Sequence, residues 1–138
     1  METIFLAQDI KVFYVTATSF PDGIQGAYQK LHSLIGSPKG RRFFGLSNPE
    51  TPSKIIYKAA VEESYSEEGE KLGCETFIIK KGQYISIYIK DFMKDIPKIG
   101  QSFRELVADE RIDPKGCCVE EYVNDQDVRC LVRLKDNS

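Results

Sequence analysis

The stretch Cys117-Cys118-Val119-Glu120-Glu121-Tyr122-Val123 has the composition of a β-strand. Successive side chains of a strand point to opposite faces, so one face of this strand carries Cys118, Glu120 and Tyr122. Burying a carboxylate beside a phenol costs several kcal/mol unless the carboxylate is paired, which makes Glu120 a candidate for ligand contact. The alternative is that Glu120 faces water, because antiparallel strands commonly have one solvated face.

The residues on either side of this strand predict the rest of the second half of the chain. The segments Cys74–Ile79 and Tyr84–Lys90 are strand-like, and Gly82 between them indicates a bulge or tight bend in one long strand. A helix from Ile96 to Val107, with Asp95 as its cap, follows. The helix has a predicted buried stripe: Ile96, Ile99, Phe103, Leu106 and Val107. After the Cys117–Val123 strand, a turn at residues 124–127 leads into a last strand at 128–134.

The first half of the chain predicts the same order of elements. A strand from Lys11 to Phe20 ends at Pro21, and an amphipathic helix runs from Ile24 to Ile35. Two short strands at 41–46 and 55–61 form a hairpin around a turn at 47–52. The acidic segment Glu62 to Gly73 reads as a connecting loop.

Strand, helix, strand, strand occurring twice predicts an α+β fold built of two halves, at about 10–64 and 74–135 of a single domain, 1–138. We expect an antiparallel sheet, two long helices and a pseudo-two-fold axis, with a ligand cleft between the halves. Aromatic strand residues are candidates to line that cleft: Phe43, Phe44, Tyr57, Tyr84, Tyr88 and Tyr122.

The composition narrows the class of partner. With 138 residues the chain has enough surface to bury a core without metals or disulfides. A net charge of -2 gives no general attraction to nucleic acid, and no apolar run is long enough for a membrane span or a signal peptide, so we expect a cytoplasmic protein.

Neither the cysteines nor the histidine indicates a metal site or another cofactor. The four cysteines lack paired spacing and read as small apolar residues: Cys74, Cys117, Cys118 and Cys130. The single histidine, His32, lies off the apolar stripe of the first helix, so we expect it on a solvated face.

The sequence resembles the GyrI-like small-molecule-binding domain, which is also the effector-binding half of AraC-type and MerR-type multidrug regulators. The likeness covers about Lys11 to Leu134. Five short motifs in order carry it: Phe20-Pro21-Asp22-Gly23, Phe44-Gly45-Leu46-Ser47, Ile56-Tyr57-Lys58-Ala59-Ala60-Val61, Lys81-Gly82-Gln83-Tyr84 and Val119-Glu120-Glu121-Tyr122-Val123.

This resemblance implies a duplicated, SHS2-type fold and a carboxylate, here Glu120 of a Glu-x-Tyr motif completed by Tyr122, that faces bound and often cationic ligands. No DNA-binding helix-turn-helix precedes the domain in this sequence, so we expect a stand-alone binder of small organic molecules rather than a single-chain regulator.

Two alternatives remain open. Some GyrI-like proteins hydrolyse strained cyclopropane rings of DNA-alkylating compounds, which implies xenobiotic detoxification with Glu120 as base and Tyr122, Tyr57 or Tyr84 as proton donor. The family member that gave its name is an inhibitor of DNA gyrase, and the acidic segment 62–70 is the candidate docking loop for such a protein partner.

Overall fold

The structure is a computed structural model that describes residues 1–36, 40–51 and 54–136. It confirms the α+β class, with antiparallel strands and two long helices. The chain divides into two compact units. One unit is Ile10–Ile79, and the other combines Met1–Asp9 with Lys80–Ser138.

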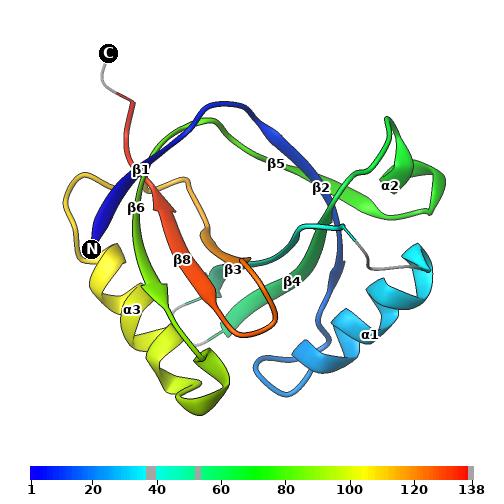
Figure 1. Cartoon of the computed structure of the whole chain (residues 1–138), viewed down its shortest axis with the longest axis horizontal. Helices are drawn as coiled ribbons and strands as arrows, with labels where there is room; N and C mark the ends of the chain where they lie inside the picture. The colour runs from blue at the N-terminus through cyan, green and yellow to red at the C-terminus, as the bar shows by residue number, and fades with distance from the viewer. Residues whose placement is uncertain (37–39, 52–53, 137–138) are drawn as a thin grey trace. The chain divides into compact units, whose positions relative to one another are not determined.

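The Ile10–Ile79 unit is a sheet with the strand order β3-β4-β2-β5, covered on one face by α1. Its elements are β2 (Ile10–Thr16), α1 (Ile24–Ile35), β3 (Phe43–Thr51), β4 (Lys54–Glu62), the short helix α2 (Glu68–Lys71) and β5 (Glu75–Ile79). Figure 1 shows α1 beside β2 and β4. Ala27 and Leu31 of α1 pack on Phe13, Ala59 and Val61, which lie on one face of the sheet.

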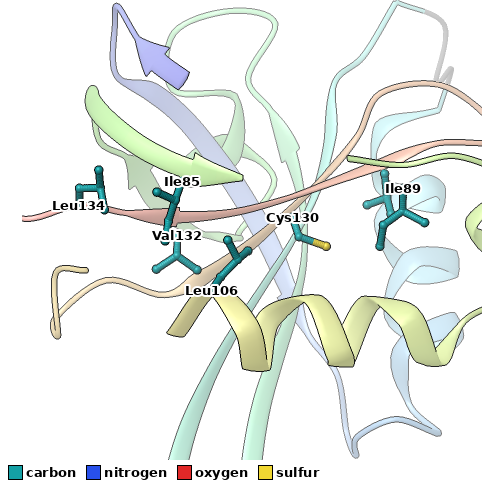
Figure 2. Packing of buried hydrophobic residues seen from close by; sticks show 7 residues of the cluster. Ile85, Ile89, Leu106, Cys130, Val132 and Leu134 are labelled. Atoms are coloured by element: carbon teal, nitrogen blue, oxygen red, sulfur yellow. The ribbon is translucent and has the colours of Figure 1, made fainter. Parts of the chain in front are cut away.

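The second unit is a sheet with the order β1-β6-β8-β7, and α3 packs on β6 and β8. Its elements are β1 (Glu2–Leu6), β6 (Gly82–Ile89), the 3-10 turn η1 (Phe92–Lys94), α3 (Pro97–Val107), β7 (Cys118–Tyr122) and β8 (Val128–Arg133). Figure 2 shows Leu106 of α3 beside Cys130 and Val132 of β8. The face of β8 that carries these two residues is therefore a core face.

The boundaries of the compact units differ from those of the predicted halves. The predicted strand segments Cys74–Ile79 and Tyr84–Lys90 are confirmed as β5 and β6. Their interpretation as one long strand is wrong, since β5 pairs with β2 while β6 pairs with β1 and β8. Gly82 has a φ of +134°, which L side chains rarely adopt, and the backbone N–H of Lys81 donates to Asp9. Strands β5 and β6 are therefore separated at these residues. Strand β1, which we did not predict, belongs to the second unit.

The first helix agrees with its predicted limits, and the second is shorter. Ile96 is the N-cap of α3 and no side chain caps that end, so the prediction of Asp95 as cap is wrong. Ile96 and Val107 are 48% and 46% exposed, and the buried stripe is the narrower set Ile99, Phe103 and Leu106.

Three loop and strand predictions in the first half also need correction. The strand predicted to Phe20 ends at Thr16. The turn predicted at 47–52 is wrong, because β3 continues to Thr51; Pro52 lies outside the described residues. The segment predicted as a loop from Glu62 to Gly73 contains α2. Within the part of the chain described here, no helix combines the length and apolarity needed to cross a bilayer.

Candidate functional site

Glu120 is a buried carboxylate in the middle of β7. Its residue surface is 8% exposed, which excludes the alternative that it lies on a solvated face. The hydroxyl of Tyr122, two residues along the same strand, donates a hydrogen bond to Oε1 of Glu120 over 2.5 Å. Because strand residues two apart share a face, the alternation predicted from the sequence brings this carboxylate and this phenol together.

The face that carries Glu120 is the core face under α3. In the register of β7 with β8, Glu120 lies opposite Cys130 and Tyr122 opposite Val128. Cys130 and Val128 are core residues that pack with Leu106 of α3. Directly opposed residues of paired strands point to the same side, so the carboxylate sits at an apolar surface.

Phe92 of η1 extends this group and was missed in the sequence. Its ring meets that of Tyr122 edge-on, with 5.6 Å between the ring centroids. The backbone N–H of Phe92 donates to the carbonyl of Gln126 over 2.9 Å, which fixes η1 beside the turn that follows β7. An aromatic residue just before a helix was the available signal, but its position depends on the 3-10 turn η1, which the sequence pattern does not predict.

The pKa of the Cys130 thiol, which lies opposite Glu120, shows that the surface around both residues is apolar. Burial, with a smaller contribution from the nearby charge of Glu120, raises the pKa of the Cys130 thiol to about 12. Cys130 is therefore a protonated core residue, as predicted for the cysteines. All four cysteines are free thiols.

Tyr84 and Tyr88 lie on the other face of the same sheet. They are opposite Arg133 and Arg129 of β8, residues that alternate with the core residues of that strand. The Tyr84 hydroxyl donates to the carbonyl of Lys80, and the Tyr88 hydroxyl donates to Asp127. The structure does not bring these two tyrosines together with Glu120.

The remaining predicted residues belong to the Ile10–Ile79 unit. Tyr57 is buried, shares a hydrogen bond of 3.0 Å with the hydroxyl of Tyr28 and stacks against Phe20. Phe43 lies opposite Val61 on the face that α1 covers, whereas Phe44 is opposite Ala60 on the reverse face. Tyr57 and Phe43 therefore share a face, and Phe44 does not. Tyr28 and Phe20 are aromatic partners that were not among the residues predicted to line the cleft.

The acidic segment 62–70 and His32 both make contacts with other side chains of the Ile10–Ile79 unit. Glu68 is buried and accepts two hydrogen bonds of 2.7 Å from the guanidinium of Arg41. Glu70 pairs with Lys11. His32 is exposed, as predicted, with its ring 4.9 Å from that of Phe43. Among the described residues, no group of three or more His, Cys, Asp or Glu side chains is arranged to hold a metal ion.

Comparison with known proteins gives similar structures but no similar sequence. No family model and no curated protein matches the chain. A hydrolase from Listeria innocua has a TM-score of 0.62 at 12% identity, over 97% of this chain and 90% of that chain. SAV2435 bound to tetraphenylphosphonium has a TM-score of 0.63 at 13% identity, over 98% of this chain and 94% of that chain.

A third similar structure comes from a larger assembly. EcmrR, in a complex with DNA, has a TM-score of 0.63 at 11% identity; the match covers 99% of this chain and 58% of that one. At such low identity these likenesses establish the fold alone. The chain thus has the same fold as a hydrolase, a protein bound to an organic cation and part of a DNA-bound protein.

Proposed function

We propose that this chain is a GyrI-like small-molecule-binding domain that binds aromatic organic cations at Glu120 and Tyr122. The observation that carries the proposal is the buried carboxylate of Glu120 on the apolar, α3-facing side of β7. Glutamate is seldom buried in a folded protein, and here the Tyr122 hydroxyl donates to the buried carboxylate.

The chemistry of the neighbouring groups favours a flat or aryl-substituted cation. A positive charge about 4 Å from a carboxylate gains roughly 4 kcal/mol at an effective dielectric constant of about 20, well above its value in water. Tyr122 and Phe92 add two aromatic rings at the same place, and aromatic faces attract cations. A ligand that combines a positive charge with aryl groups would gain both the interaction with the carboxylate and the contact with the aromatic rings.

The structural neighbours support the same class of ligand. SAV2435, which has this fold, is bound to tetraphenylphosphonium, a cation with four phenyl groups. The five sequence motifs that resemble the GyrI-like family include the Glu-x-Tyr motif at Glu120 and Tyr122. We restrict the proposed site to this pair and to Phe92, since Tyr84 and Tyr88 lie on the reverse face of the sheet.

Calorimetric titration with tetraphenylphosphonium tests the proposal. We expect saturable binding to the wild type and weaker binding to Glu120→Gln, which keeps an oxygen for the Tyr122 hydroxyl but removes the charge. Glu121→Gln is the matched control, because Glu121 is the next residue, lies on the reverse face and pairs with Arg129. Equal affinities of all three proteins would contradict the proposal.

A second candidate function is hydrolysis of strained, electrophilic rings, favoured by the direct hydrogen bond from the Tyr122 hydroxyl to the Glu120 carboxylate. In this reaction Glu120 takes a proton from water as the water oxygen bonds to a cyclopropane carbon and the ring C–C bond breaks. The electron pair of that bond moves to a conjugated carbonyl, whose oxygen takes a proton from Tyr122. The shared hydrogen bond then returns the proton from Glu120 to Tyr122.

The two functions differ in a simple measurement. Incubation with a carbonyl-conjugated cyclopropane, followed by mass spectrometry, detects the product that is heavier than the substrate by one water. Hydrolysis predicts that Glu120→Gln and Tyr122→Phe both lose turnover while Glu121→Gln keeps it. A substrate that binds to the wild type but is recovered unchanged would leave binding as the function and contradict hydrolysis.

A further inference from the structure

Strand β1 (Glu2–Leu6) forms one edge of its sheet. It pairs with β6 from Glu2 opposite Ser86 to Leu6 opposite Gly82, and it comes first in the strand order. Figure 1 shows it beside β6. An edge strand presents a row of backbone N–H and C=O groups that a further strand can pair with.

Strand β1 lacks lysine, proline and a bulge, three of the features that normally prevent pairing. Natural sheets protect their edges with lysine, proline, bulges or a covering element. The stretch Glu2–Leu6 contains neither lysine nor proline, and its register with β6 is regular along all five residues. Glu2 is its only charged residue.

Phe5 gives β1 an exposed apolar surface. Its side chain is 70% exposed, and Met1 just before the strand is 59% exposed. Burying a phenylalanine side chain is favourable because it removes a large apolar surface from water. The edge strand β5 of the other unit differs, because its most exposed apolar residue, Ile78, is 40% exposed and its Glu75 accepts a hydrogen bond from Tyr14.

We propose that β1 pairs antiparallel with β1 of a second copy of this chain, about a two-fold axis at Ile4. In that register Ile4 is opposite its own copy, Thr3 is opposite Phe5 and Glu2 is opposite Leu6. The two carboxylates of Glu2 therefore lie at opposite ends of the strand pair, so this register brings no like charges together. Both Phe5 rings lie on one face of the joined sheets, where each covers part of the new strand pair.

Sedimentation equilibrium on the full chain tests the proposed dimer. We expect the wild type to be dimeric and Phe5→Lys to dissociate, because a lysine on an edge strand opposes pairing. Ile78→Lys is the matched control, an exposed apolar residue on the other edge strand, and it should remain dimeric. A monomeric wild type, a dimeric Phe5→Lys or a monomeric Ile78→Lys would each overturn the proposal.

The register has its own test, which does not depend on the stability of the interface. Directly opposed residues have Cβ atoms about 4.5 to 5.5 Å apart, close to the spacing of a disulfide. Under mild oxidation Ile4→Cys should crosslink two chains through position 4, identified by peptide mass spectrometry, and Glu2→Cys should not crosslink to itself. The reverse pattern, or crosslinking only through the native cysteines, would rule out the register.

Discussion

Glu120 and Cys130 lie directly opposite each other on β7 and β8, so that a buried carboxylate shares a sheet face with a thiol that has no exposed surface. The same face packs under Leu106 of α3. The carboxylate is thus part of the inner surface of its unit. If the proposed ligand binds beside Glu120, its charge interacts with the carboxylate in surroundings where such interactions are stronger than in water.

The Cys130 thiol should resist alkylation while the protein is folded. Its pKa is raised to about 12, chiefly by burial, so the reactive thiolate is scarce at neutral pH. Cys117 and Cys118 are only partly buried. Iodoacetamide labelling followed by peptide mass spectrometry should modify Cys118 before Cys130, and should modify both equally after denaturation. Equal rates in the native protein would contradict the burial of Cys130.

Packing of α3 is tested by two adjacent residues. Leu106 is fully buried, so Leu106→Ala should lower the free energy of unfolding by about 2 to 5 kcal/mol. Val107 is 46% exposed, and Val107→Ala should change the free energy by about 0.5 kcal/mol or less. Urea unfolding monitored by circular dichroism measures both. Similar losses in the two variants would mean that α3 presents a different face to the sheet.

The sequence pattern was sufficient for elements whose own side chains determine their structure. The spacing of Ala27 and Leu31 predicts the helix Ile24–Ile35, and simple alternation places Glu120 beside Tyr122. It was insufficient where the partner strand matters. Tyr84 lies on the reverse face because β6 is paired with β8 in a particular register, and neither strand's sequence states that register.

The same limit explains why the predicted halves have different boundaries from the two compact units. Residues 74–90 read as one long strand because both β5 and β6 are rich in β-branched and aromatic residues. Their separation depends on pairing of β5 with β2 and of β6 with β1, which are contacts far apart in the sequence. In Glu2–Leu6 two polar residues are followed by three apolar ones, so the sequence has no alternation from which β1 could be predicted.

The Arg41–Glu68 pair should stabilise the Ile10–Ile79 unit in a pH-dependent way. Arg41→Met leaves the buried carboxylate without its guanidinium and should cost about 3 kcal/mol near neutral pH. The Arg41 hydrogen bonds lower the pKa of Glu68 in the folded state, so this stabilisation is present above the ordinary pKa of a glutamate and is lost as pH falls through the lowered value. Urea unfolding at neutral and acidic pH measures the difference.

The adjacent Arg42 is the control for that measurement. Arg42 is more exposed and its ion pair with Glu62 is 3.5 Å long, so Arg42→Met should cost no more than about 1 kcal/mol at any pH. If the two arginine variants lose equal stability, or if the loss in Arg41→Met does not shrink in acid, Glu68 is not held by a buried ion pair.

Two helical glycines should respond to alanine in opposite directions. A Cβ at Gly26 of α1 would meet no atom within 4 Å, so Gly26→Ala should stabilise the protein by about 0.5 to 1 kcal/mol. At Gly69 of α2 the added atom would lie 2.6 Å from Cβ of Phe13, so Gly69→Ala should destabilise by about 1 to 3 kcal/mol. Thermal unfolding should therefore show Tm shifts of opposite sign. Shifts of the same sign would refute the close contact of α2 with β2.

The central claim is that Glu120 acts on a ligand through its charge, and the most direct measurement compares two similar ligands, tetraphenylphosphonium and the neutral triphenylphosphine oxide. Calorimetry on the wild type and on Glu120→Gln gives four affinities. We predict that the substitution weakens binding of the cation roughly tenfold or more, which is about 1.4 kcal/mol. The affinity for the neutral ligand should be nearly unchanged, because stacking on Tyr122 and Phe92 remains. Equal weakening of both ligands, or weakening of neither, would contradict the claim.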